Sequence, residues 1–348
     1  MADRIKKRIT PIARRLDLSY MIRLSGQSDI FPFYHVISDW HLPHIRHLYR
    51  YRRLNEFEKD LEEMLKWFEP VTLADYLEVE QKGKEKGKGK RKGKGKGKGK
   101  GKGRMVLTFD DGLEECHQTI APLLKKKGVP AAFFLNNHFI DNRGLFFRYK
   151  ASLIIDEVLS DCKAKEKAAK YLVIPEEQVV DAIRMVNFEQ QELLDELARQ
   201  VEFNFVESLR EQPVYMNSQQ VEELVDWGFE IGGHSPDHAD FSTLDPAVMI
   251  SQVKDSIEDL QQRFGVSSRF FSFPFTSDGV PGEVIDTLLN DRIADVLLGT
   301  AGLKKTEKQG FIQRIPMEDY EMPFKDALKT EYLYYLMKIP VGRNTIRY

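Results

Sequence analysis

Cysteine and long apolar runs are scarce in this chain of 348 residues. The two cysteines, Cys116 and Cys162, fall on separate predicted helices and form no paired spacing, which excludes a disulfide framework or a thiolate metal site. A reducing compartment is therefore favoured. No segment is apolar for long enough to cross a membrane, and no apolar core follows the basic N-terminus as it would in a secretory signal. We expect a cytoplasmic protein, with peripheral membrane contact as an alternative.

A strong net charge is also lacking, because the formal total is −2. Residues 82–104 nevertheless carry eleven lysines and two arginines against one glutamate, a net of +12 that leaves −14 for the rest of the chain. This Gly-Lys stretch contains no apolar residue, which predicts a disordered loop. It also contains no aromatic residue to stack on bases, so we expect no specific nucleic-acid partner. A membrane-associated scaffold that acts through the basic loop is an alternative function.

The N-terminal segment combines cations with a helical apolar spacing. Ile5, Ile9, Ile12 and Leu16 lie at near-helical intervals between arginines and lysines. Such a helix could lie on an anionic membrane surface. We favour the other interpretation, a helix packed on the domain.

From residue 30 onward, about seven strand patterns alternate with helical patterns, which predicts an α/β fold built as a (β/α) barrel. One long stretch, residues 141–213, carries helical patterns divided by Pro175 and Pro213 and predicts a mostly helical insertion. The predicted divisions are a basic amphipathic segment (1–29), the start of the barrel (30–81), the Gly-Lys loop (82–104), barrel (105–140), a helical insertion (141–213), barrel (214–322) and a C-terminal helix (323–348).

Acids and histidines follow two of the predicted strands. Asp110 and Asp111 end a buried strand pattern and precede Gly112, and His234 and His238 follow another strand that ends in glycines. Adjacent side chains on a strand point to opposite sides, so the two aspartates are expected to have different roles. Catalytic groups of parallel barrels gather at these strand exits.

One carboxylate and two imidazoles form a three-ligand set for zinc or a similar ion, with a fourth position open for water. Such an ion lowers the pKa of its water to about 7, and the second carboxylate is placed to take the proton. Each half also has a structural interpretation, since Asp-Asp-Gly often forms a turn and two histidines four apart are often unrelated to metal. Their shared place at strand exits favours the metal site.

Three other histidines, His41, His44 and His47, have a spacing that imitates a metal site. Pro43 disturbs a helix there, and no acid lies among them. We favour loop or interface packing.

Residues 108–112 (TFDDG) and 234–238 (HSPDH) together resemble the polysaccharide deacetylase, or NodB-homology, family of carbohydrate esterases. The resemblance extends loosely from about residue 30 to 320, outside the Gly-Lys loop. It implies a distorted (β/α)7 barrel and a metal-dependent hydrolase that removes acetyl groups from sugars. It further implies that Asp111, His234 and His238 bind the metal and that Asp110 is the catalytic base.

The family's usual arginine beside a proline-rich turn is missing here. Arg314, on a late strand, could replace it or could be a structural ion-pair partner, which we favour. The run Phe273, Pro274 and Phe275 at this turn is expected to form an apolar wall that binds the sugar ring and its acetyl methyl group.

The late histidine that supplies the acid in the family is also absent, because no histidine follows His238. Exopolysaccharide (poly-N-acetylglucosamine) deacetylases are similar in having their acid histidine on an early strand. His35 matches that position and is our candidate general acid. The alternative for His35 is a satisfied core histidine.

The expected enzyme is thus a hydrolase of carbon–nitrogen bonds other than peptide bonds, acting on N-acetylated or O-acetylated sugars. We expect one divalent metal, Zn²⁺, with Co²⁺ or Ni²⁺ as alternatives. The expected partner is an acetylated glycan or a lipid- or nucleotide-linked sugar. A catalytically impaired barrel that only binds glycan is an alternative, given the two altered motifs.

Overall fold

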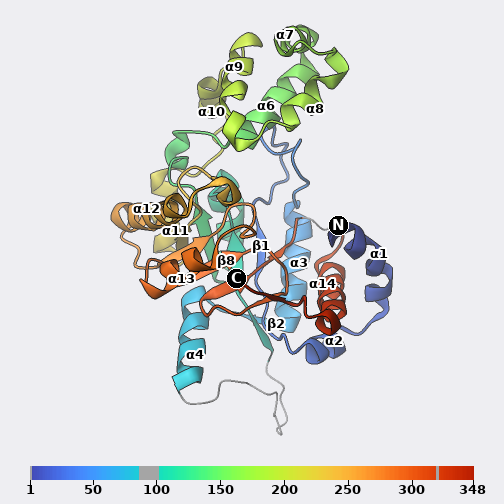
Figure 1. Ribbon diagram of the computed structural model, residues 1–348, viewed down its shortest axis with the longest axis vertical. Helices are drawn as coiled ribbons and strands as arrows, with labels where there is room; N and C mark the ends of the chain where they lie inside the picture. Colours follow the sequence, from blue (N-terminus) through green and yellow to red (C-terminus); the bar gives the residue numbers. More distant parts are fainter. Residues whose placement is uncertain (1, 86–101, 319–320) are drawn as a thin grey trace.

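A computed structural model describes residues 2–85, 102–318 and 321–348 of the chain. Figure 1 shows a central barrel, with a group of helices at one end and α4 (Leu73–Glu85) at the other. The expected α/β class is confirmed.

Eight strands form one all-parallel sheet in the order β10–β8–β7–β6–β5–β4–β1–β11. They are β1 (Pro32–Tyr34), β4 (Leu107–Phe109), β5 (Ala131–Leu135), β6 (Glu230–Gly233), β7 (Phe270–Ser272), β8 (Val296–Gly299), β10 (Phe311–Gln313) and β11 (Ile315–Pro316). Two small parallel pairs lie outside this sheet, β2 (Phe68–Pro70) with β3 (Gly103–Met105) and β9 (Lys305–Thr306) with β12 (Thr345–Ile346).

The edge strands β10 and β11 are consecutive in the chain and separated by Arg314 alone. The Arg314 backbone N–H donates to Gly299 of β8, whereas the N–H of Ile315 donates to Phe31 beside β1. The two short strands therefore act as one that changes partner at Arg314 and closes the sheet. The result is a seven-stranded barrel, which confirms the predicted distorted (β/α) barrel.

Helices cover the outside of the barrel. They are α1 (Ala2–Arg15), α2 (Leu18–Ser25), α3 (Leu54–Trp67), α5 (Ala121–Lys127, after a π-helical turn Cys116–Ile120), α11 (Ser218–Asp226), α12 (Pro246–Phe264), α13 (Gly282–Asn290) and α14 (Phe324–Lys338). Strand residues alternate between this helical layer and the interior. Phe133 and Leu135 of β5 pack with the outer helices, whereas Phe134 packs inside with Val296 and Leu298.

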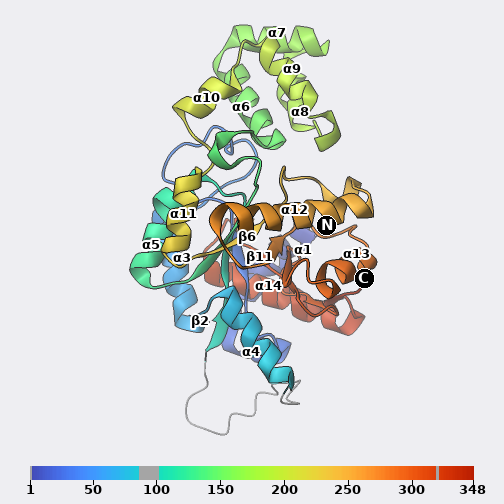
Figure 2. The ribbon, with the colours of Figure 1, turned by 90° about the vertical axis from the view of Figure 1, so that its left-hand side faces the viewer.

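Residues 141–213, predicted as a helical insertion, contain five α-helices between β5 and β6. They are α6 (Phe147–Ser160), α7 (Cys162–Leu172), α8 (Val179–Arg184), α9 (Glu192–Gln200) and α10 (Phe205–Glu211). Figure 2 shows these helices gathered at one end of the barrel. Because the chain enters them from the end of β5, this is the end where the strands terminate. Their core includes Ile154 and Ile155, and it continues into Leu42 and Ile45 of the loop after β1.

The N-terminal helix α1 packs along α14. Ile9 is buried in this contact, whereas Ile12, predicted on the same apolar face, is 58% exposed. Thr10 and Ala13 are buried in its place, so the buried face is rotated from the predicted one. The helix packed on the domain is therefore observed, and membrane contact stays a prediction.

The predicted Gly-Lys loop is shorter than residues 82–104 on both sides. Residues 82–85 belong to α4, and Gly103 and Arg104 belong to β3, which pairs with β2. The remaining part, 86–101, lies outside the described residues, so its disorder stays a prediction. No helix among residues 2–85, 102–318 and 321–348 combines the length and apolar character needed to span a bilayer.

Candidate active site

A cavity of about 540 Å³ lies between the strand ends of the barrel and the insertion. The strand exits contribute His35, Asp110, Asp111, His234 and His238 to its lining, and the insertion contributes Arg148, Tyr149 and Arg184. The volume is typical of a site for a small molecule or part of a larger one. The predicted catalytic and metal-binding residues are thus together in one cavity.

Asp110 and Asp111 both line this cavity, although alternation along a strand predicts that they point to opposite sides. The strand ends at Phe109, and the backbone then turns left-handed, with φ 73° at Asp111 and 71° at Gly112. A Cβ at Gly112 would lie 2.9 Å from Leu135, so only glycine fits this turn without movement. The turn brings the second carboxylate back over the barrel, which strand periodicity could not predict.

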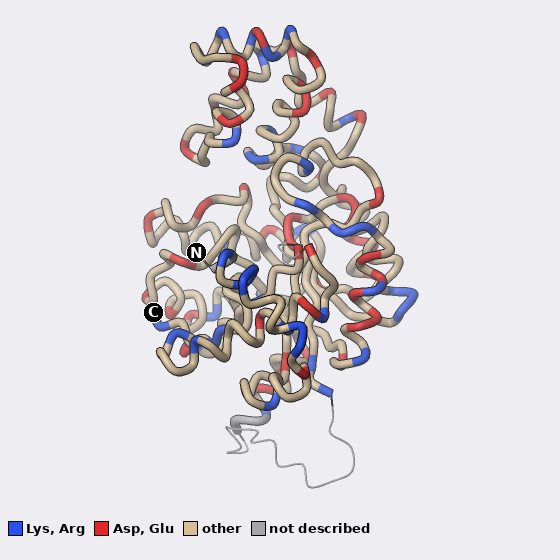
Figure 3. Tube along the Cα trace, turned by 90° about the vertical axis from the view of Figure 1, so that its right-hand side faces the viewer, with Lys and Arg blue, Asp and Glu red and all other residues tan. Residues whose placement is uncertain are grey.

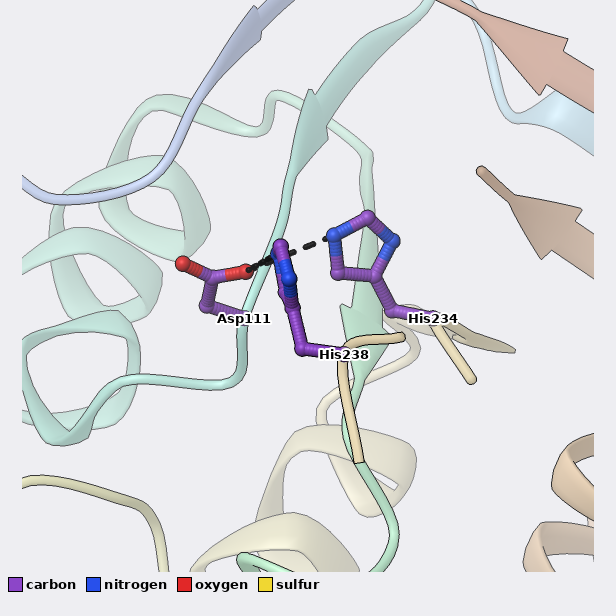
Figure 4. A group of neighbouring side chains, drawn as sticks. All are labelled: Asp111, His234 and His238. Atoms are coloured by element: carbon purple, nitrogen blue, oxygen red, sulfur yellow. Dashed lines mark ion pairs between the residues drawn. The ribbon is translucent and has the colours of Figure 1, made fainter. Parts of the chain in front are cut away.

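Asp111, His234 and His238 form the one group with metal-ligand composition among the described residues. Their candidate ligand atoms all lie within 4.8 Å of one another. Figure 4 shows both rings facing the Asp111 carboxylate, whose Oδ1 lies 3.4 Å from Nε2 of His234 and 3.3 Å from Nε2 of His238. One oxygen and two nitrogens of these types suit zinc and related ions.

The surroundings of this group fit a cation. Asp111 Oδ1 is buried and accepts no hydrogen bond within the described chain, while its Oδ2 accepts one from the Tyr149 hydroxyl at 2.5 Å. The His234 Nδ1 lies 2.8 Å from the carbonyl of Ser272 and is placed to donate to it, which leaves the Nε2 lone pair facing Asp111. Burial lowers the pKa of His238, which favours the neutral ligand form.

Asp110 is held by Arg314 in the interior of the barrel. The guanidinium donates to Oδ1 at 2.8 Å and to Oδ2 at 2.7 Å, and it also donates to the hydroxyls of Thr108 and Ser272. Burial raises the pKa of Asp110, but the Arg314 charge and hydrogen bonds outweigh it and lower the value. Arg314 is therefore an ion-pair partner, as favoured from the sequence, and its partner is the candidate base; that it replaces the missing arginine of the family stays a prediction.

His35 is paired with Glu318, which follows β11. The His35 Nδ1 contacts Glu318 Oε2, and the backbone N–H groups of His35 and Val36 donate to Oε1 at 2.8 and 2.9 Å. Burial disfavours the imidazolium, but the charge and hydrogen bond of Glu318, with smaller effects of both aspartates, raise the pKa of His35 to about 10. His35 thus lines the cavity with its Nδ1 paired to a carboxylate, and its role as general acid stays a prediction.

The three residues predicted to form an apolar wall have different surroundings. Phe275 lines the cavity, with its ring 4.6 Å from that of His238 in an edge-on arrangement. Phe273 also reaches the lining but is fully buried in the core formed with α12 and α13. Pro274 is not among the lining residues. Substrate contact by these residues stays a prediction.

The histidine group at 41, 44 and 47 forms no metal-ligand cluster among the described residues. His44 is buried with its ring 5.4 Å from that of Tyr149, and burial lowers its pKa to about 3. His47 lies 3.1 Å from Asp156 of α6. The favoured interpretation, packing of this loop, agrees with these contacts.

Three residues that contact the predicted site were not assigned a role from the sequence. They are Tyr149, Ser272 and Glu318. Two of them have a weak sequence signal, their place at a strand end. Ser272 is the last residue of β7, and Glu318 lies two residues after β11. Tyr149 carries no such signal, because it lies in the first turn of α6, in an insertion whose placement depends on packing.

A closed parallel barrel with an aspartate–histidine–histidine cluster and a second, arginine-bound aspartate at the strand ends has the architecture of a barrel hydrolase. The profile of the polysaccharide deacetylase family matches residues 97–288, more than half of the chain. The chain belongs to this family and is a carbohydrate deacetylase.

Three solved structures share the fold at low sequence identity. The deacetylase PplD of Streptococcus pyogenes, in complex with acetate, is 12% identical with a TM-score of 0.53, over 87% of this chain and 97% of that one. IcaB from Ammonifex degensii is 14% identical with a TM-score of 0.53 and the same coverage. A de-N-acetylase from Aggregatibacter actinomycetemcomitans is 14% identical with a TM-score of 0.51, over 87% and 99%. No curated protein matches the sequence.

Proposed function

We propose that the protein hydrolyses the acetamido group of N-acetylated sugars in a polysaccharide or glycan precursor, and that the reaction depends on one divalent cation. One observation carries the proposal: a group of candidate metal ligands, a second carboxylate and an imidazole paired with a glutamate line the same cavity. These groups are Asp111 with His234 and His238, Asp110, and His35.

Asp111, His234 and His238 would hold the cation. Zinc suits this donor set, and Co²⁺ and Ni²⁺ are alternatives. When bound, the ion would supply Lewis-acid chemistry by polarising the acetyl carbonyl and making water a stronger nucleophile. Tyr149 and the Ser272 carbonyl would keep the ligand atoms in place through their hydrogen bonds to Asp111 and His234.

Asp110 acts as the general base in this proposal. Its lowered pKa keeps the carboxylate ionised, and it accepts a proton from water as the water oxygen forms a bond to the acetyl carbon. Arg314 donates hydrogen bonds to both carboxylate oxygens, which restricts the base to one orientation. Arg314 is not among the residues that line the cavity, so it would act through Asp110.

His35 acts as the general acid. Glu318 keeps its imidazole protonated over the neutral range, and the proton passes to the sugar nitrogen as the carbon–nitrogen bond breaks. Acetate and a free amino sugar are the products. An amine leaves poorly unless it is protonated, so this pair favours N-acetyl over O-acetyl substrates.

The alternative of a barrel that binds glycan without turnover rested on the two altered motifs. In this proposal Arg314 and His35 take the roles of the two missing residues, and each has a direct hydrogen-bond partner. This supports turnover over binding alone.

Acetate release tests the proposal. N-acetylated and O-acetylated sugars and oligosaccharides are incubated with the protein before chelator treatment, after it, and after Zn²⁺ is restored. We expect release from N-acetylated substrates that stops with chelator and returns with metal. His238→Ala should bind less than one equivalent of metal by elemental analysis. Undiminished release after complete metal removal, or stoichiometric metal in the variant, would contradict the proposal.

A further inference from the structure

Two arginines of the insertion face the cavity, and the proposed chemistry uses neither. Arg148 lies on α6 and Arg184 ends α8, and both belong to the lining. The side chains of α6 and α8 are brought together by the core of the insertion. The two cations therefore belong to the wall that faces the strand ends.

Arg148 lies close to the candidate metal cluster. Its guanidinium is 4.6 Å from the centroid of the Phe275 ring, and this ring is 4.6 Å from that of His238. One aromatic ring thus separates the cation from a candidate metal ligand. A charged group on a sugar bound at the cluster could reach Arg148 from the same cavity.

Arg148 has no acidic partner at ion-pair distance among the described residues. Partial burial lowers its pKa, and Asp240 opposes this only through its charge. Arg184 has one partner, Asp181 of the same helix, at 3.5 Å, and both side chains are largely exposed. Exposed pairs of this geometry contribute little, so Arg184 remains available for another anion.

The carboxylates that line the cavity do not balance these arginines. They are Asp110, Asp111 and Glu318, all at the strand ends. Arg314 binds Asp110, His35 binds Glu318, and the third is a candidate metal ligand. Figure 3 shows acidic and basic residues interspersed along the insertion, so the two arginines are not part of a uniformly basic surface.

We propose that Arg148, with Arg184, forms a subsite for an anionic group, a phosphate or a carboxylate, carried by the acetylated sugar. A guanidinium binds either group through two parallel hydrogen bonds, and the Arg148 guanidinium lies over the ring of Phe275. A neutral sugar offers these arginines hydroxyl and carbonyl acceptors but no counter-charge. The inference rests on the proposed function, since it places the acetamido group at the strand ends and the anion toward the insertion.

Matched acetamido sugars test the subsite. N-acetylglucosamine 1-phosphate, N-acetylmuramic acid and the neutral methyl glycoside of N-acetylglucosamine are compared by kcat/KM for acetate release. We expect at least one anionic sugar to exceed the neutral one by tenfold or more, with an advantage that shrinks as salt is added. The anionic sugar with the higher kcat/KM shows whether the subsite prefers phosphate or carboxylate. Arg148→Gln should reduce the anionic-to-neutral ratio about tenfold.

Arg199→Gln is the matched control, because Arg199 lies on the same insertion, outside the cavity lining, in an exposed pair with Glu196. Its ratio should equal that of the wild type. Equal kcat/KM for all three sugars in the wild type, or an unchanged ratio in Arg148→Gln, would overturn the subsite.

Binding measured by calorimetry on the full chain separates the two proposals. All three proteins are used at the same measured metal content, so any anion bound by the metal contributes equally. Weaker binding of either anionic sugar to Arg148→Gln alone supports the subsite even if no sugar is deacetylated, which would overturn the proposed function only. Equal binding of both anionic sugars by the three proteins overturns the subsite.

Discussion

Arg314 and Asp110 form a bidentate ion pair inside the barrel, with Nη1–Oδ1 and Nη2–Oδ2 distances of 2.8 and 2.7 Å. Both side chains are buried, and the same guanidinium donates to the hydroxyls of Thr108 and Ser272. Such a pair holds its geometry firmly, and removal of one partner leaves a buried charge unpaired. The candidate base is therefore coupled to the stability of the barrel.

Asp110→Asn should retain metal and lose most activity. An amide cannot accept the proton from water, so we expect kcat to fall by about 10²–10⁴. The variant should also be less stable by about 3–5 kcal/mol, because Arg314 keeps its buried charge without a counterion. Acetate release, elemental analysis and urea unfolding measure the three effects. Asp245→Asn, an exposed aspartate without a side-chain cap hydrogen bond, is the control. Wild-type turnover in Asp110→Asn would exclude it as the base.

Arg314→Lys should keep the charge and lose the two parallel hydrogen bonds. The base then varies in orientation, and we expect kcat to fall by about 10² with little change in KM, since Arg314 is not among the residues that line the cavity. Arg269→Lys is the control, because Arg269 makes two similar hydrogen bonds to Asp295 on the surface. A higher KM with an unchanged kcat would contradict the positioning role.

Arg314→Met should change the pH dependence as well. Arg314 lowers the pKa of Asp110, so the pair adds stability above the ordinary aspartate value of 3.8, and this is lost as the pH falls through the lower folded-state pKa. Without the cation, burial dominates and the pKa rises. The acid limb of kcat/KM should then move to higher pH, as measured by a pH–rate profile. An unmoved limb would show that another group titrates there.

Glu318→Gln should lower the pKa of His35 from about 10. We expect the basic limb of kcat/KM to move down by about one pH unit or more. The folded-state pKa is raised, so the pair stabilises fully below pH 6.5 and its contribution disappears as the pH rises through about 10. The unfolding free energy of the variant should thus differ from the wild type most near pH 6. Urea unfolding at several pH values measures this, with the exposed Glu189→Gln as control. A difference that grows with pH would contradict the assignment.

Tyr149→Phe should weaken metal binding without removing a ligand. The hydroxyl donates to Asp111 Oδ2 at 2.5 Å, and loss of such an outer hydrogen bond typically costs 10–100-fold in metal affinity. The phenyl ring keeps its contact with Phe146, so stability should change little. Competition with a chelator of known affinity measures the change. Tyr171→Phe, on α7 of the same insertion, should bind metal like the wild type.

Local sequence patterns were sufficient to predict the barrel and the proximity of the acids and histidines at its strand ends. Apolar strands such as Leu107–Phe109 and Glu230–Gly233 are each followed at once by an acid or a histidine. The carboxyl ends of parallel strands meet at one end of a barrel, so the two aspartates were expected near His234 and His238, and the family resemblance implied Asp111 as the ligand; the three residues are neighbours. That a metal binds them stays a prediction.

Strand periodicity failed where the backbone leaves the strand. It predicts opposite directions for Asp110 and Asp111, whereas the positive φ of Asp111 turns both into the cavity. The turn depends on the close approach of Gly112 to Leu135 of the neighbouring strand. The Asp-Gly pair is a local signal for such a turn, but the direction in which the turn carries the Asp111 side chain is visible only in the folded barrel.

The partners of the catalytic candidates were decided by the tertiary structure alone. Arg314 is separated from Asp110 by 204 residues, and Glu318 from His35 by 283. Both contacts exist because β10 and β11 change partner at Arg314 and close the barrel in one register. The sequence by itself determined which residue types stand at the strand ends. The register of closure and the packing of the insertion determined which of them touch, because pairing across such distances leaves no periodic signal in the chain.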